Sequence, residues 1–342
     1  MNARALDPIA EGTPIVVGAI DDNMAYPLLV WAWSLSQSTT LSPLFVIGHL
    51  EDSLSVHHQH MLGECLTALN VRHHFISLSH DARFISQGHI SPTTFTKFML
   101  ADMVTLPHVW IDVDTVASHG WDDLFDVVRN LPEPLSLVVA KRGKGQSEAR
   151  GGPSSLAFNA GVLGWPGSAR KPWSERLSDL PLVETQEQAL FNELYAHSVH
   201  TVSESFNTLT YRIDSLEGSP PPKILHYAGA HKPWHLPRRF RKLCVEYQCP
   251  WSLWFAAEEE LLEALAQKNV TADLATPRRH ALGTGGWSLR SDHRGRLLLT
   301  VLRILGPLGW VVVFVAQALR TPVPRGTHPL HYGARKTKGK KP

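Results

Sequence analysis

The sequence predicts an α/β fold with a mostly parallel sheet that is covered by helices on both faces. Short β-branched runs alternate with helical segments along the first two thirds of the chain, and acidic residues follow directly after two of those runs. Such alternation is typical of βαβ units, in which helical crossovers join parallel strands. The sequence contains no internal repeat.

The expected elements follow one another in a regular order. We predict strands at residues 15–20, 44–48, 73–78, 108–113, 135–140, 161–165 and 224–227. We predict helices at residues 27–35, 55–69, 92–104, 184–196 and 254–268. The segment 142–155 is rich in Gly, Ser and charged residues, which is typical of a loop.

Length and composition are those of a globular protein with an unusual charge distribution. The chain has 342 residues, of which 43% are hydrophobic and 19% charged, so a wholly disordered chain is excluded. The net charge of +2 does not predict a nucleic-acid partner. Residues 277–342, however, hold 13 Lys or Arg and one acid, whereas residues 1–276 carry a net charge of −10. The two parts are therefore expected to have different roles.

The basic C-terminal part contains an apolar segment, residues 297–319, with one charge in 23 residues. Its uncharged core, residues 304–319, would span ~24 Å as a helix, which is less than the ~30 Å of a bilayer core. Pro307 would also interrupt a helix, and basic residues flank both sides. We expect residues 290–342 to bind the anionic inner leaflet, although a true span or a buried C-terminal helix stays open.

The cysteines and the N-terminus predict a cytoplasmic protein. Cys65, Cys244 and Cys249 form neither a disulfide framework nor a C-x-x-C metal site, so reduced, buried thiols are expected. Residues 1–14 lack the apolar region of a signal peptide.

Two carboxylates at the end of a buried strand are the strongest chemical feature. Asp112 and Asp114 stand at positions i and i+2 where the predicted strand 108–113 ends. Acids at the carboxyl end of a strand face the crevice in which α/β folds bind ligands, and neighbouring carboxylates repel each other unless a cation lies between them. Oxygen ligands suit Mg²⁺ or Mn²⁺. Alone, the pattern D-x-D is weak, because surface turns produce it by chance.

A second group of residues lies near position 230. His226 follows an apolar run and could supply a nitrogen ligand to the same metal. Gly229 would allow the backbone to approach a phosphate closely, and Lys232 would place a positive charge on it.

With these motifs the sequence resembles the retaining glycosyltransferases of family 8, in particular the bacterial lipopolysaccharide galactosyl- and glucosyltransferases. The resemblance covers residue 15 to about residue 237. It rests on D-x-D, on the H-x-x-G-x-x-K-P-W string from His226, and on four further elements in the family's order: Asp21-Asp22-Asn23, His89 to Lys97, Phe158-Asn159-Ala160-Gly161-Val162, and Glu187-Gln188 followed by Asn192.

The resemblance implies a GT-A fold that binds a UDP-hexose with Mn²⁺, or with Mg²⁺. By this likeness the metal ligands are Asp112, Asp114 and His226. The donor's nucleotide side would contact Asp21, Asn23 and Lys97, its diphosphate Gly229 and Lys232, and its sugar Asn159, Glu187 and Gln188. Residues 1–245 would form the catalytic domain, residues 246–276 a helical segment packed on it, and residues 277–342 the basic extension.

The expected reaction is retaining hexosyl transfer to a lipid-linked or cell-envelope glycan. We expect front-face attack, with Gln188 or Glu187 shielding the oxocarbenium, while a covalent intermediate on Glu187 stays open. Lys141, Arg142 and Ala189 depart from the family's pattern, as does Glu187 in place of Asp, so the donor hexose is not specified. The alternatives are a non-catalytic UDP-sugar-binding protein recruited to the membrane and a nucleotide-sugar hydrolase.

Overall fold

The computed structural model of the 342-residue chain describes residues 9–84, 91–140, 158–167, 173–177, 186–210, 213, 222–229, 232–235, 241, 244–245 and 249–284. The expected loop 142–155, the neighbouring Lys141, and the whole extension after residue 284 lie outside these residues.

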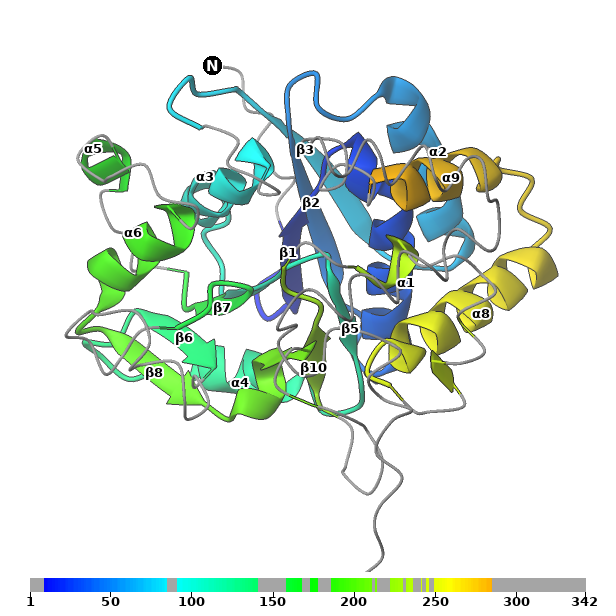
Figure 1. Ribbon diagram of the computed structural model, residues 1–342. Coiled ribbons are helices and arrows are strands. Elements are labelled where there is room, and N and C mark those ends of the chain that lie inside the picture. The colour runs from blue at the N-terminus through cyan, green and yellow to red at the C-terminus, as the bar shows by residue number, and fades with distance from the viewer. Residues whose placement is uncertain are drawn as a thin grey trace, which may run out of the picture.

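A seven-stranded sheet runs through the molecule in the order β3-β2-β1-β4-β7-β6-β8 (Figure 1). Neighbouring strands from β3 to β4 are parallel, β7 is antiparallel to both β4 and β6, and β8 is parallel to β6. The predicted α/β sheet, mostly parallel, is therefore confirmed. The strands are β1 (Ile15–Ala19), β2 (Leu44–Leu50), β3 (His73–Leu78), β4 (His108–Ile111), β6 (Leu137–Ala140), β7 (Val162–Trp165) and β8 (Val199–Val202).

Helices cover both faces of this sheet and define two apolar cores. Side chains alternate along a strand, so Val16 of β1 enters one core and its neighbours Ile15 and Val17 enter the other. Figure 1 shows the two groups of helices on opposite sides. The first core receives α1 (Ala25–Gln37), α2 (Val56–Ala68), α4 (Asp123–Arg129), α8 (Ser252–Gln267) and α9 (Ala275–Thr284), and the second α3 (Thr96–Met103), α5 (Trp173–Leu177) and α6 (Gln186–Tyr195).

A smaller sheet brings distant segments to the end of β4. It consists of β5 (Thr115–Ala117), β10 (Ile224–His226) and β9 (Thr208–Leu209), with β10 in the middle. β10 is antiparallel to β5, and its residue His226 pairs with Thr115. The backbone N–H of Tyr227 donates to the carbonyl of Asp114 over 2.9 Å. The two motifs, more than 100 residues apart, are thereby placed side by side.

The chain after residue 276 differs from the sequence-based expectation. The sequence assigns residues 277–342 to a basic extension outside the packed domain, but α9 continues to Thr284 and contacts α1 and the 3₁₀ turns η1 (Asp22–Met24) and η5 (Pro233–His235). Arg278 of α9 reaches the buried carboxylate of Glu258 on α8 over 3.0 Å. The expected boundary at residue 276 therefore falls inside a packed helix.

None of the helices in the described part of the chain combines the length and the apolar character needed to cross a bilayer. The expected membrane-associating segment 297–319 lies outside that part.

Candidate metal centre and active site

The two acids of the D-x-D motif leave the carboxyl end of β4 where β4 meets β7. The backbone N–H of Asp112 donates to the carbonyl of Gly161 over 2.8 Å, which holds this strand end against the start of β7. The hydroxyl of Thr115 donates to the carbonyl of Asp112 over 2.8 Å and closes the turn between the two acids. The local backbone therefore fixes Asp112 and Asp114 at the edge of the large sheet.

His226 approaches these acids from β10. Its Nε2 lies 3.2 Å from Oδ1 of Asp114 and 3.9 Å from Oδ2 of Asp112. One ligand atom from each of the three residues lies within 4.8 Å of the others. The structure thus brings together the three side chains that the resemblance implied as metal ligands.

The protonation of His226 is fixed by Asn207, at the end of the 3₁₀ turn η3 (Glu204–Asn207). Nδ1 of His226 lies 2.8 Å from Oδ1 of Asn207, an atom that can only accept, so Nδ1 carries a proton. In a neutral imidazole, Nε2 then presents its lone pair to Asp114 and Asp112. Three electron-pair donors that face one another require a cation between them, so these residues fit a divalent metal ion.

Lys232 neutralises Asp114 from the other side. Its ammonium group forms an ion pair with Oδ2 of Asp114 and donates to the carbonyl of Tyr227 over 2.7 Å. Burial alone would raise the pKa of the Asp114 carboxyl, but the positive charge of Lys232 opposes burial and the pKa lies well below its usual range. Asp114 is therefore ionised, as a metal ligand must be.

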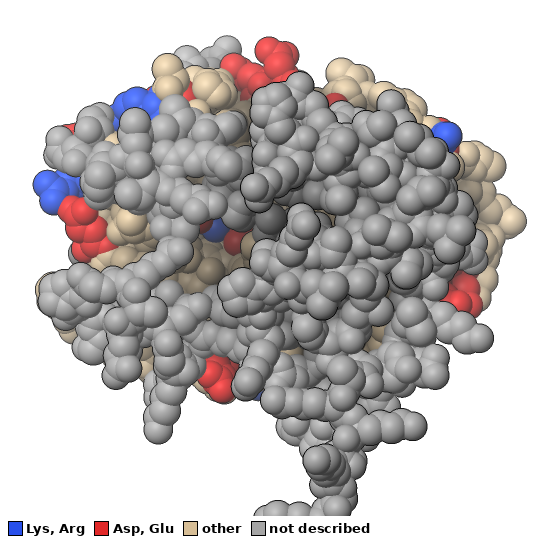
Figure 2. All heavy atoms as spheres, viewed as in Figure 1, with Lys and Arg blue, Asp and Glu red and all other residues tan. Residues whose placement is uncertain are grey.

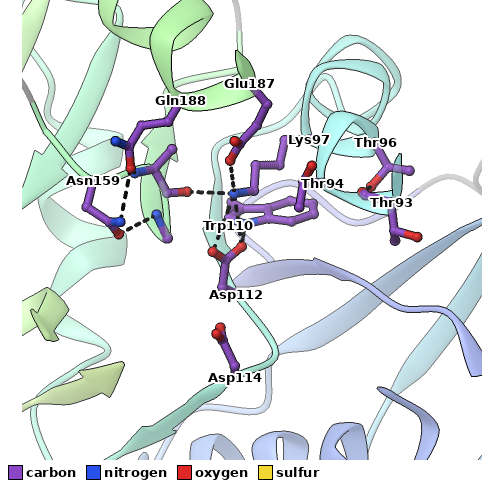
Figure 3. Close-up of polar contacts among 12 residues, drawn as sticks. Thr93, Thr94, Thr96, Lys97, Trp110, Asp112, Asp114, Asn159, Glu187 and Gln188 are labelled. Carbon is purple, nitrogen blue, oxygen red and sulfur yellow. Dashed lines mark hydrogen bonds and ion pairs between the residues drawn. The ribbon is translucent and has the colours of Figure 1, made fainter. Parts of the chain in front are cut away.

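Lys97 forms the centre of a buried charge network (Figure 3). Its side chain is 2% exposed, and Nζ lies 3.1 Å from Asp112 Oδ1, 3.0 Å from Glu187 Oε1 and 3.1 Å from the carbonyl oxygen of Ala160. Burial lowers the pKa of Lys97, but the two carboxylates outweigh burial and raise it above the ordinary value. The resemblance assigned Lys97 to the nucleotide side of the donor; here the three contacts of its charged end are with protein groups.

The residues implied for the sugar form a hydrogen-bonded group between β7 and α6. The side-chain NH₂ of Asn159 donates to Oε1 of Gln188 over 3.0 Å, and Oδ1 of Asn159 accepts from the N–H of Gly161 over 2.9 Å. Asn192 anchors α6 by accepting from the N–H of Phe158 over 2.7 Å and donating to its carbonyl over 3.0 Å. Figure 3 shows Glu187 and Gln188 on the side of Lys97 away from Asp114, and Asn159 to the left of Lys97.

Gly161 allows the imidazole to lie against the backbone. A Cβ at this position would lie 2.2 Å from Cε1 of His226 and 2.8 Å from Oδ1 of Asn159. Both atoms belong to side chains held by further hydrogen bonds, so neither can move freely. Glycine is therefore required here by the packing of the site.

Asp21 and Asn23 lie at the carboxyl end of β1, the strand next to β4. Asp21 caps η1 by accepting from the N–H of Asn23, and its Oδ2 accepts from the hydroxyl of Ser91, both over 3.0 Å. Asn23 Oδ1 lies 2.9 Å from Nε2 of His280 on α9. Both residues therefore stand at the sheet edge that also presents Asp112.

Gly229 adopts a backbone conformation that favours glycine. Its φ angle is +100°, and a Cβ there would meet no atom within 4 Å. Among the described residues nothing fills the space beside this turn, as close approach of a ligand to the backbone requires. In Figure 2 a few acidic and basic side chains of the described residues are visible near the centre of this face.

Two further residues hold these groups in place, and the sequence motifs do not identify their roles. Asn207 binds His226 and Asn159, and the indole N–H of Trp110 donates to Oδ1 of Asp112 over 2.7 Å. Asn207 belongs to none of the motifs used above. Trp110 directly precedes the D-x-D strand end, and an alternating strand places it on the same face as Asp112.

The fold and the site together define a protein of the GT-A class, with an acid–acid–imidazole cluster at the carboxyl edge of a mixed α/β sheet. A model of the family described as Glycosyl transferase family 8 matches residues 15–236, which is more than half of the 342 residues. The chain belongs to glycosyltransferase family 8, and the resemblance noted in its sequence is confirmed.

Solved structures show the same fold. Two crystal structures of LgtC, an active-site mutant and a galactosyltransferase complex with donor and acceptor sugar analogs, are 20% identical, with TM-scores of 0.57 and 0.56. Each match covers 77% of this chain and 99% of LgtC. The apo form of the glycosyltransferase GlyE from Streptococcus pneumoniae TIGR4 is 19% identical over 75% of this chain and 64% of GlyE, with a TM-score of 0.53. A comparison with curated protein sequences gave no match.

Proposed function

We propose that this protein is a Mn²⁺-dependent, retaining glycosyltransferase that moves glucose or galactose from a UDP-sugar to a lipid-linked or cell-envelope glycan. The acceptor would be met at the cytoplasmic face of the membrane. One observation carries the proposal: in a chain of family 8, ligand atoms of Asp112, Asp114 and His226 lie within 4.8 Å of one another.

The donor set of two carboxylates and one imidazole is compatible with Mn²⁺, whereas an oxygen-only set would suit Mg²⁺ better. When bound, the ion supplies positive charge that neutralises the leaving diphosphate. The chain's own contribution is to hold the three ligand atoms in place, with Lys97 paired with Asp112 and Lys232 paired with Asp114 on two sides of the cluster.

The other residues have separable roles. Lys232 has a flexible stem, so its ammonium group can move from Asp114 to a phosphate oxygen. Gly229 lets the backbone approach the diphosphate, while Asp21 and Asn23 contact the nucleotide from the end of β1. Asn159, Glu187 and Gln188 line the sugar.

The surroundings of Glu187 favour front-face attack over a covalent intermediate. Glu187 is only 8% exposed, and Oε1 is paired with the ammonium group of Lys97. Such a carboxylate is a poor nucleophile, because attack would break a buried ion pair and leave Lys97 partly uncompensated. Mass spectrometry after incubation with a slow UDP-sugar analogue tests this, and a hexosyl adduct on Glu187 would require the covalent mechanism instead.

The function itself is tested by hydrolysis and transfer assays with UDP-glucose and UDP-galactose, each with and without Mn²⁺. We expect turnover that needs the ion and is lost in Asp114→Ala. Equally negligible rates in both proteins, with UDP binding retained in the wild type, would favour the non-catalytic binding protein. If free hexose is released, and no added glycan acceptor lowers the rate of that release, the result would favour a hydrolase.

A further inference from the structure

Asn207 lies between the metal-type cluster and the sugar side of the site. It is 6% exposed and ends the turn η3 directly before β9, which pairs with the strand of His226. Its oxygen faces Nδ1 of His226 at 2.8 Å, and its nitrogen faces Oδ1 of Asn159 at 2.9 Å. Asn159 in turn contacts Gln188. The four side chains form a continuous chain of hydrogen bonds.

The direction of every bond in this chain follows from one backbone group. The N–H of Gly161 can only donate, so the Asn159 atom 2.9 Å away is the amide oxygen. The nitrogen of Asn159 must then face Gln188, and the Gln188 atom 3.0 Å away is its oxygen. A second donor, the N–H of Ala160, approaches the same Gln188 oxygen at 3.4 Å.

The donor and acceptor atoms on the way to the metal ligand His226 are assigned in the same way. Oδ1 of Asn159 can only accept, so Asn207 turns its NH₂ group toward it and its oxygen toward His226. His226 must donate from Nδ1, and Nε2 is left for the acids. At the other end, Nε2 of Gln188 has no hydrogen-bond partner among the described residues. Gln188 therefore presents an amide donor, and its oxygen is already engaged.

On the basis of the function proposed above, we propose that Asn207 is a positioning residue that acts on both halves of the reaction site. Toward β10 it holds His226 in the form whose Nε2 can bind a metal ion. Toward α6 it orients Asn159, and through Asn159 it turns the NH₂ group of Gln188 outward as a hydrogen-bond donor for a sugar hydroxyl or the leaving phosphate oxygen. A neutral donor in that place cannot shield an oxocarbenium or act as a nucleophile, so this role replaces the one expected for Gln188 from the sequence.

Three substitutions distinguish the effect of Asn207 on His226 from its effect on Asn159. Asn207→Asp keeps an acceptor for His226 but has no proton to donate to Asn159. Asn207→Ala removes both contacts. Asn159→Asp keeps the acceptor for Gly161 and Asn207 but cannot donate to Gln188, and it introduces the same charge as Asn207→Asp.

The first measurement is Mn²⁺ affinity, from the electron paramagnetic resonance of the free ion. Loss of a hydrogen-bond partner to a ligating histidine lowers metal affinity by about 10–100-fold, which is the loss expected for Asn207→Ala. Asn207→Asp is expected to bind at least as tightly as the wild type, and Asn159→Asp within about threefold of it. Turnover of UDP-sugar should fall in all three variants, with kcat reduced for Asn207→Asp although its metal site is intact.

The second measurement does not depend on metal. The Nδ1–H of His226 should give a slowly exchanging downfield proton resonance in the metal-free protein, assigned by its absence from His226→Gln. We expect it to persist in Asn207→Asp and to disappear in Asn207→Ala. Asn130→Asp, at the exposed end of α4, serves as the control and should change neither measurement.

Equal Mn²⁺ affinities of Asn207→Asp and Asn207→Ala, or an unchanged Nδ1–H resonance in Asn207→Ala, would overturn the proposal. If Asn207→Ala does not fold, the comparison of Asn207→Asp with Asn159→Asp still decides, because the proposal requires a metal site that is intact in both and a sugar side that is impaired in both. A wild-type protein that binds no Mn²⁺ would contradict the proposed function, whereas the resonance would still report on Asn207.

Discussion

Asp112 and Asp114 are each held by a lysine, and the two lysines differ in how freely they can move. Lys97 is buried between two carboxylates and a carbonyl, whereas the side chain of Lys232 is 15% exposed and follows an open glycine turn. Lys97 is therefore a fixed part of the framework. The ammonium group of Lys232, by contrast, can move away from Asp114 when a ligand binds.

This difference predicts opposite effects of Lys232→Met on two ligands. Without the ammonium group, Asp114 has no competing cation, so Mn²⁺ should bind more tightly in the absence of nucleotide. UDP should bind more weakly even with Mn²⁺ present, because the diphosphate loses a charge-assisted contact. Calorimetric titration with each ligand separately measures both. Weaker binding of Mn²⁺ alone would contradict the competition between Lys232 and the metal.

Lys97→Met should instead damage the fold. The substitution leaves Asp112 and Glu187 unpaired at a buried position, and removing one partner of a buried ion pair costs roughly 3–5 kcal/mol. Lys223→Met is the control: its partner Asp123 has a side chain that is 62% exposed, so a loss of about 0–1 kcal/mol is expected. The free energy of urea unfolding measures both, and similar losses in the two variants would show that Lys97 is not structurally special.

Among single residues, the sequence identifies those whose chemistry is unusual in their context, such as two strand-end acids and a histidine after an apolar run. It does not identify Asn207, because an asparagine in a short turn is common and only the folded contacts show its two partners. It identifies Lys97 as important through the resemblance, yet the three internal partners of Lys97 come from three different elements and no spacing predicts them.

Among the elements, the start of β7 has the strictest packing requirement of the site, at Gly161 directly before the strand. Gly161→Ala would drive a methyl group into His226 and Asn159, so we expect a loss of Mn²⁺ affinity of at least about 10-fold, the effect of displacing a metal-ligating histidine from its supports. Far-ultraviolet circular dichroism should show the fold retained. Gly63→Ala on α2 is the matched control, since its Cβ would lie 3.8 Å from Nε2 of His73 and alanine favours helix. Unchanged affinity in Gly161→Ala would contradict the close approach of His226 to this backbone.

The helix α9 is anchored through one of two adjacent arginines. Arg278 reaches Glu258, whose side chain is 1% exposed and also accepts from the hydroxyl of Tyr26 over 2.7 Å, whereas Arg279 contacts only α9 itself among the described residues. Arg278→Met should therefore destabilise the protein by about 1–3 kcal/mol, and Arg279→Met by less than about 0.5 kcal/mol. Urea unfolding of both variants measures this. Equal stabilities would mean that Tyr26 and Arg241, which also forms an ion pair with Glu258, satisfy this carboxylate without α9.

Elements with strong apolar patterns were predictable, and weakly patterned ones were not. The run 73–78 matches β3 in both bounds because its ends coincide with turn residues. β8 (VHTV) is a short edge strand without a buried face, and it was missed. α9 has a composition of Gly, Arg and His that is typical of a linker, and it is helical because Ala281 and Arg278 pack on other helices.

For the whole molecule, the remaining feature is the separation of charge between an acidic body and a basic extension. The described part ends at α9, and residues 285–342 hold eleven Lys or Arg and one Asp. Each basic residue close to an anionic membrane contributes about 1 kcal/mol, so we expect this segment to be sufficient for binding. The body supplies no such patch by composition, because residues 1–276 carry a net charge of −10.

A chain that ends at Thr284 tests this division of roles without cutting α9. We expect it to keep the urea stability and donor turnover of the full chain, because the contacts of Arg278 and His280 remain. It should no longer sediment with vesicles that contain phosphatidylglycerol, whereas the full chain should, with binding that weakens as salt rises. Neutral phosphatidylcholine vesicles distinguish electrostatic binding from apolar insertion. Binding of the full chain to these vesicles would assign the membrane contact to residues 297–319. Sedimentation of the shortened chain with anionic vesicles would place the membrane contact on the body, where the acidic composition gives no reason to expect it.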